Sequence, residues 1–368
     1  MENNHVTKLE IDLNAIDFNF NYFKSKLHKN TKVLVVVKAF GYGSSAVEIA
    51  RFLASKVDYF AVAYSDEGIA LRKAGIETPI LVLHPQKCNL DNIIQYNLEP
   101  NIYSVRLLTN FIEKTQISKL QNYPIHVKFN TGLNRIGFNS NDISEIVSTL
   151  KNQPSVYVKS IFSHVAASED LNERKFTLQQ ISSFNTLTKE FISHLNYSPF
   201  KHMLNTSGII NYSEEAQFDM VRLGIGVYGF GNNENETKKL QNVLTLKSII
   251  SQINTLKKGE TIGYNRAFKA TSTIKTATIP IGHADGISRQ LGNGVGYIFI
   301  NNIKAPIVGN VCMDMMMVDI STIDCNEGDE VVIFKNQQHI DQLSNIINTI
   351  PYEILTAISQ RIRRILKI

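Results

Sequence analysis

The chain has 368 residues, a formal net charge of +5 and 43% hydrophobic residues, and this length predicts two domains rather than one core. The modest charge gives no reason to expect a nucleic-acid partner, and no apolar run approaches the roughly 20 residues that span a bilayer. The N-terminus, MENNHVTKLEIDLNAI, lacks a basic region followed by an apolar stretch, so no secretory signal is expected. Three cysteines without metal or redox spacing (Cys88, Cys312 and Cys325) suit a reducing cytoplasm.

Up to about residue 230, β-branched apolar segments alternate with helical patterns. A short strand at 8–13 and a helix at 14–27 come first. Further strands are predicted at 33–38, 58–63, 80–83, 99–103, 125–129, 156–163, 201–204 and 219–222, and helices between them, for example at 45–54, 65–74 and 174–195. Strands that alternate with helices predict a parallel sheet. Eight of them in about 200 residues predict a closed (β/α)8 barrel.

The pattern changes after the polar stretch GNNENETKK, which is typical of a linker. Alternation with a period of two follows at 243–250, 272–280, 297–300, 316–320 and 330–334, which predicts a mainly β domain. A helix is predicted at 352–366, with Arg361, Arg363 and Arg364 on a solvated face. We therefore predict a barrel domain at 1–232 and a β domain at 233–368, with the first ten or so residues able to join the β domain.

The stretch VLVVVKAFGYG contains a strand predicted to be buried on both faces, and Lys38 follows it. A lysine is costly to bury as a cation. Taken singly, most lysines at a strand end point into water. The alternative is a lysine whose amine forms a Schiff base with a carbonyl compound.

Other polar residues fall at or just after the ends of the predicted barrel strands, where barrel enzymes place their active sites. They are Tyr42, Arg135, His164, Asn205, Thr206 and Arg222. Each has an ordinary explanation alone, as a structural histidine, a salt-bridge arginine or a helix cap. Their grouping on one rim is harder to explain in this way and favours an active site.

The segment VVVKAFGYGSSAVEIARFL resembles the pyridoxal-phosphate lysine motif of alanine racemases, which are fold type III enzymes. The similarity continues in VRLGIGVYG, TIGYNRAF, GHADGISR, NVCMDMMMVD and IPYEILTAISQR. The resemblance implies a homodimer with shared active sites, which would interconvert L-alanine and D-alanine for peptidoglycan. The AFGYGS variant of the lysine motif resembles family members fused behind a cell-wall ligase, which would make the chain a separated domain.

The resemblance also implies how pyridoxal 5'-phosphate would be held, with the aldehyde as an imine on Lys38. Arg222 would face the pyridine nitrogen, with His164 orienting it from behind. Barrels often bind phosphate after strands seven and eight. Thr206, Gly224 and Ile225 suit that task by position, and Tyr42 and Tyr352 suit it by resemblance. Asn205 is a further expected cofactor contact.

Racemisation removes a proton from one face of the substrate and returns one to the other, so two bases are expected. Lys38 would serve one face. By resemblance, Tyr264 would serve the other from the partner subunit, with its pKa lowered from about 10 by nearby cations. The resemblance also implies that Arg135 would meet the cofactor's phenolic oxygen or the substrate carboxylate. The backbone N–H of Met313, again from the partner subunit, would face that carboxylate.

Several departures and alternatives remain open. Phe40 and His283 differ from the usual asparagine and tyrosine of the family, and the position of Lys128 is carbamylated in some members. A dinucleotide site at GIGVYG is rejected, because a helix and an acidic residue about 20 positions on are required and Leu244 stands there. The other candidates are a racemase of serine, a fold type III decarboxylase and a non-catalytic pyridoxal-phosphate-binding protein.

Overall fold

The computed structural model describes residues 5–368, which form two compact units. The barrel unit comprises Asp17–Gly41 and Ala46–Leu240. The β unit comprises the chain up to Ile16, Tyr42–Ser45 and Gln241–Ile368. The domain boundary predicted at residues 232 and 233 stays a prediction. Each unit is described separately.

The barrel unit confirms the predicted (β/α)8 fold. Its strands form a closed parallel barrel in chain order: β2 (Lys32–Val36), β3 (Tyr59–Val62), β4 (Ile80–Val82), β5 (Glu99–Ile102), β6 (Tyr123–Lys128), β7 (Val156–Phe162), β8 (Phe200–His202) and β9 (Met220–Leu223). Pairing of β2 with β9, with Val33 opposite Val221, closes the barrel. Because helices cover the sheet, its strands have apolar residues on both faces, as in KVLVV.

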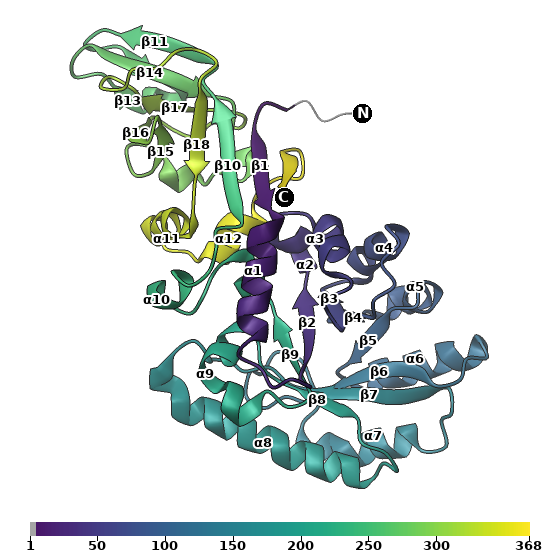
Figure 1. Cartoon of the computed structure of the whole chain (residues 1–368). Coiled ribbons are helices and arrows are strands. Elements are labelled where there is room, and N and C mark those ends of the chain that lie inside the picture. The colour runs from purple at the N-terminus through teal and green to yellow at the C-terminus, as the bar shows by residue number, and fades with distance from the viewer. Residues whose placement is uncertain (1–4) are drawn as a thin grey trace. The chain divides into compact units, whose positions relative to one another are not determined.

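Helices connect these strands, and Figure 1 shows α7 and α8 below β7. The helices are α1 (Leu13–Lys24), α3 (Ala46–Leu53), α4 (Ser65–Lys73), α5 (Leu90–Gln95), α6 (Val105–Ile117), α7 (Ile143–Leu150), α8 (Arg174–Ser193), α9 (Thr206–Ala216) and α10 (Glu234–Thr237). The short segment α2 (Lys38–Tyr42) contains non-helical, left-handed backbone. Across residues 5–368, no helix combines the length and hydropathy needed to cross a bilayer.

The β unit confirms the predicted mainly β domain. Its nine-stranded sheet has the order β11-β14-β17-β16-β15-β18-β10-β1-β19. The bounds are β1 (Lys8–Asp12), β10 (Leu244–Ile249), β11 (Gln252–Leu256), β14 (Ile274–Ile279), β15 (Tyr297–Ile300), β16 (Ile303–Val308), β17 (Met316–Asp319), β18 (Glu330–Phe334) and β19 (Arg363–Lys367). A small sheet pairs β12 (Thr261–Ile262) with β13 (Phe268–Lys269), and two helices follow, α11 (Gln337–Ile346) and α12 (Pro351–Thr356).

The helix predicted at 352–366 is wrong, because α12 ends at Thr356 and β19 begins at Arg363. β19 pairs in parallel with β1, at the opposite end of the chain. Of the three arginines expected on a solvated face, Arg361 and Arg363 are exposed. Arg364 does not fit that expectation, because it is half-buried and donates to backbone carbonyls, including those of Gly43 and Ile358. A local pattern cannot reveal a strand whose partner is so distant in sequence.

Candidate active site

Lys38 is followed by a turn of left-handed backbone. The φ angles of Ala39, Phe40, Gly41 and Tyr42 are 52°, 56°, 63° and 53°. Each non-glycine residue in this conformation costs about 1–2 kcal/mol, and such strain is concentrated at functional sites. Gly41 is required for a second reason, because an added Cβ would lie 2.8 Å from the backbone nitrogen of Ala46. The turn ends the strand at the point where Lys38 leaves it.

Four basic side chains influence one another at this end of the barrel. Burial, then Arg135, lowers the pKa of Lys38, and burial, then Arg222, lowers the pKa of Lys128 to about 7. Within residues 5–368, none of these four side chains forms an ion pair with a carboxylate. A site with four basic groups and no carboxylate in an ion pair with them suits an anionic ligand such as a phosphate or carboxylate.

Arg222 is buried, with 4% of its surface exposed, and neutral acceptors surround its guanidinium. Nη1 donates to His202 Nδ1 at 2.9 Å, and Nη2 donates to His164 Nδ1 at 2.9 Å. Nη2 also donates to the carbonyls of Ser163 and Met203. Because a guanidinium can only donate, both imidazoles accept at Nδ1 and are neutral. Burial, reinforced by the Arg222 charge, lowers the pKa of both histidines well below its usual value.

A hydrogen-bonded chain continues from His202 through the barrel interior. His202 Nε2 lies 2.9 Å from Ser160 Oγ, and Ser160 Oγ lies 2.6 Å from His126 Nδ1. His126 Nε2 lies 2.6 Å from Glu99 Oε2. Since Arg222 cannot accept and a carboxylate cannot donate, every donor in the chain points from Arg222 towards Glu99. These hydrogen bonds therefore hold the Arg222 guanidinium in a fixed orientation as a donor.

These four residues were not predicted from the sequence. His126, Ser160 and His202 are buried polar residues in strands of the barrel. A polar residue in such a strand must find a hydrogen-bond partner inside the barrel. That rule was the available signal.

Ser160→Ala is expected to destabilise the barrel, because it leaves buried nitrogen atoms of His126 and His202 without their partner. Leaving a buried polar group unsatisfied costs about 1–3 kcal/mol. We expect the free energy of unfolding to fall by about 2 kcal/mol, measured as a lower urea midpoint. Ser148→Ala is the matched control, because the Ser148 hydroxyl is exposed and bonds only the carbonyl of Glu145 in its own helix. Equal midpoints for the two variants would contradict the prediction.

Thr206 joins the loops that follow β8 and β9. Its Oγ1 accepts hydrogen bonds from the backbone N–H groups of Gly224 at 3.0 Å and Gly226 at 3.3 Å. Asn205 is the N-cap of α9 and accepts from Gly208 N–H at 2.8 Å. The 3-10 turn Ile225–Tyr228 begins beside this hydroxyl. A helix N-terminus, a hydroxyl and glycine backbone in one place are suited to bind a phosphate.

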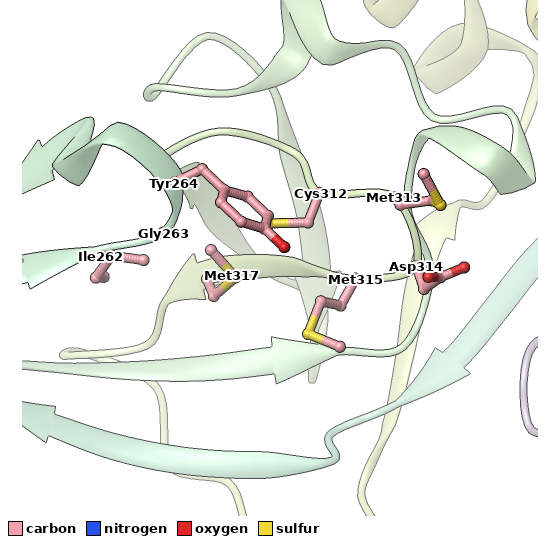
Figure 2. A pocket seen from close by; sticks show the side chains of 8 residues that line it. All are labelled: Ile262, Gly263, Tyr264, Cys312, Met313, Asp314, Met315 and Met317. Carbon is pink, nitrogen blue, oxygen red and sulfur yellow. The ribbon is translucent and has the colours of Figure 1, made fainter.

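In the β unit, Tyr264 lines an open pocket of about 510 Å³. The pocket is lined by Ile262, Gly263, Tyr264, Cys312, Met313, Asp314, Met315 and Met317. Figure 2 shows the Tyr264 ring beside Cys312, with its hydroxyl directed towards the middle of the pocket. Tyr264 is 75% exposed, and its turn has positive φ at Gly263, Asn265 and Arg266. A large exposed aromatic residue in a strained turn is typical of a contact with a ligand or another chain.

The segment at Met313 is held against the GHAD loop. His283 N–H donates to the carbonyl of Cys312 and Ala284 N–H to that of Met313, at 2.9 and 3.0 Å. Arg361 bridges Asp285 and Asp314 at 2.6 and 2.7 Å. Within residues 5–368, the Met313 N–H has no hydrogen-bond partner. This donor is therefore fixed and available.

Tyr42 and Tyr352 also lie together in the β unit. Their ring centroids are 6.0 Å apart, and burial raises the pKa of Tyr42. The other predicted residues divide between the units. Tyr264 and Met313 belong to the β unit, whereas the barrel unit holds Lys38, Arg135, His164, Asn205, Thr206, Arg222, Gly224 and Ile225.

The barrel with a lysine at the end of its first strand, followed by a β unit that carries an exposed tyrosine, is the arrangement that the sequence resemblance implies for a pyridoxal-phosphate-dependent amino-acid racemase. Residues 11–231 match the family description "Alanine racemase, N-terminal domain", and residues 243–366 match "Alanine racemase, C-terminal domain". The chain belongs to the alanine racemase family, as the sequence resemblance predicted.

Individual relatives match over nearly their whole length. "Alanine racemase 1" of Caldanaerobacter subterraneus subsp. tengcongensis is 32% identical over 98% of this chain and 94% of its own. The alanine racemase of Thermodesulfovibrio yellowstonii is 34% identical over 96% of both chains. The structure of the Clostridium difficile alanine racemase has a TM-score of 0.92 at 31% identity, covering 98% of this chain and 96% of its own.

The alanine racemase of Bartonella henselae is described with covalently bound pyridoxal phosphate. Its structure has a TM-score of 0.87 at 28% identity and covers 98% of this chain and 99% of its own. Pyridoxal phosphate is the cofactor of this family, as predicted. A phosphate-bearing group fits the basic residues around Lys38 and the loop where the Thr206 hydroxyl meets the backbone of Gly224.

Proposed function

We propose that this protein interconverts L-alanine and D-alanine and supplies D-alanine for peptidoglycan. Two bases would act, Lys38 and, from the partner subunit of a homodimer, Tyr264. The observation that carries the proposal is Arg222, which is buried at 4% exposure and held by neutral acceptors near Lys38. A fold type III decarboxylase would instead place an acid at this position.

Pyridoxal phosphate, when bound, delocalises the charge left on a substrate carbon that loses its proton. Lys38 would hold the cofactor covalently, and Thr206, Asn205, Gly224 and Ile225 would bind its phosphate, with Tyr42 and Tyr352. Arg222 would donate to the pyridine nitrogen. Burial, then Arg135, lowers the pKa of Arg222 to about 9, so it stays charged at neutral pH. An arginine gives up its proton far less readily than an acid, so the nitrogen would remain largely unprotonated.

Lys38 and Tyr264 would exchange protons with opposite faces of the substrate. Burial and Arg135 lower the pKa of Lys38, which makes the neutral amine more available as a base. The exposure of Tyr264 in a single chain supports a role in a shared site.

The substrate carboxylate would be bound by the backbone N–H of Met313 of the partner subunit and by Arg135, which also suits the cofactor's phenolic oxygen. The bulk of Tyr352 would crowd larger side chains, so alanine is the expected substrate. Serine is the next expected substrate, because a hydroxyl adds little volume and a pocket rejects it weakly. We place the enzyme in the cytoplasm, since Cys88, Cys312 and Cys325 are free thiols.

Mixing two inactive variants tests the shared site. A heterodimer of Lys38→Ala and Tyr264→Phe chains would contain two active sites. If each site is built from Lys38 of one subunit and Tyr264 of the other, one of the two sites keeps both residues and the other has neither. Random assortment makes half of the dimers heterodimers, so co-expression is expected to recover about a quarter of wild-type racemase activity. No recovery in a sample shown by mass spectrometry to contain heterodimers would mean that each site lies within one chain.

A further inference from the structure

Glu67 connects the left-handed turn after Lys38 to the rest of the barrel unit. Its Oε1 accepts a hydrogen bond from the backbone N–H of Ala39 at 2.6 Å. Its Oε2 accepts from the N–H groups of Ala63 at 2.7 Å and Tyr64 at 3.2 Å. One carboxylate therefore joins the turn at the end of β2 to the end of β3 and the start of α4.

Capping of α4 explains only part of this arrangement. Glu67 is the third residue of α4, a position from which a glutamate often accepts from the N-cap N–H of its own helix. The bond to Tyr64 is of that kind. The bond to Ala39 is not needed for capping, because Ala39 lies 28 residues earlier in the chain and follows another strand. The Oε1 atom of Glu67 therefore bonds a strained segment of backbone, with φ values of 52° at Ala39 and 56° at Phe40.

The charge of Glu67 also acts on Lys38. Burial, followed by Arg135, lowers the pKa of the Lys38 amine, and the carboxylate of Glu67 acts in the opposite direction. The surrounding cations Arg135 and Arg222 repel the ammonium form of Lys38. Glu67 thus bonds the backbone next to Lys38, and its charge partly offsets the effect of the neighbouring cations on the Lys38 amine.

We propose that Glu67 is a positioning residue, which holds the left-handed turn and thereby fixes Lys38 where it captures the cofactor and exchanges protons. This role of Glu67 rests on the proposed role of Lys38. It goes further, because a carboxylate outside the predicted site would determine where the Lys38 amine lies. Without the charged acceptor, the strained turn is expected to open more often, and the Lys38 amine would then sample other directions.

Glu67→Gln tests the inference, because glutamine keeps the size of the side chain and removes its charge. Hydrogen exchange is measured on the holoenzyme in peptides covering 37–43. The cofactor is then stripped with hydroxylamine, and recapture of added pyridoxal phosphate is followed by absorbance. Because charge-assisted hydrogen bonds are roughly twice as strong as neutral ones, we expect about tenfold faster exchange and about tenfold slower capture. The kcat for L-alanine should fall while KM changes little.

Asp66→Asn is the matched control, because Asp66 precedes Glu67 on α4, is exposed and carries the same charge. Exchange in β6, at 123–128, reports whether the barrel remains folded in each variant. Wild-type exchange and capture in a folded Glu67→Gln protein would overturn the inference, and so would faster exchange with unchanged capture. Failure of the wild-type protein itself to capture cofactor would instead overturn the proposed role of Lys38, and with it that of Glu67.

Discussion

Lys38→Ala is expected to abolish both covalent cofactor binding and racemisation. The variant loses the amine that would hold the cofactor and one of the two bases. Because a single general base contributes about 10²–10⁴-fold, loss of both tasks should lower kcat by at least about 10⁴-fold. The protein should still fold, since Lys38 forms no ion pair with a carboxylate within residues 5–368.

Two measurements check this expectation, racemisation of L-alanine and the mass of the Lys38 peptide after borohydride reduction. Lys32→Ala is the control, because Lys32 lies at the opposite end of the same strand, where it pairs with Asp58 at 3.5 Å. The control should retain both activity and the cofactor mass. Racemisation at a wild-type rate by Lys38→Ala would remove this lysine from the mechanism.

Tyr264→Phe is expected to lower racemisation by about 10²–10⁴-fold, the usual contribution of one general base. The loss of kcat/KM must be equal in both directions, because the equilibrium constant between the two enantiomers is one. The cofactor should remain bound, because no predicted cofactor contact is changed. Lys38 should still exchange the α-proton of one enantiomer with solvent deuterium without inversion, and the other enantiomer should exchange much more slowly.

The deuterium result separates three accounts of Tyr264. A non-catalytic binding protein would show neither exchange nor racemisation, in the wild type or in Tyr264→Phe. A merely structural tyrosine would slow exchange of both enantiomers equally. Tyr297→Phe is the control, since this hydroxyl also lies in the β unit but bonds Gln342 outside the pocket.

The sequence predicted the barrel well, because its strands are short apolar runs with turn residues between them. The strand Val156–Phe162 and the helix Arg174–Ser193 differ from their predicted ranges by only one or two residues at an end. In the β unit, β15 and β18 lie at the predicted residues. The wrong helix at 352–366 arose because RRILK fits a helical pattern locally, whereas pairing with β1 decides its conformation.

The site was predictable only where a chemical group follows a strand or carries a family motif. Lys38 and Arg222 have such signals. Glu67 and Glu99 do not, because each resembles an ordinary glutamate near an element end, and only the fold brings Glu67 to Ala39 or Glu99 to His126. A polar residue inside a mostly apolar strand, such as Ser160, is itself a signal of a hydrogen-bond partner within the barrel.

Racemisation of alanine through a cofactor held by Lys38 can be tested on the purified protein with added pyridoxal phosphate. The protein is incubated separately with L-alanine and with D-alanine, and both enantiomers are followed by chiral chromatography. Each incubation should approach an equal mixture, and borohydride treatment of the enzyme beforehand should prevent this. Unchanged L-alanine and D-alanine in a sample whose Lys38 carries the cofactor would contradict this expectation.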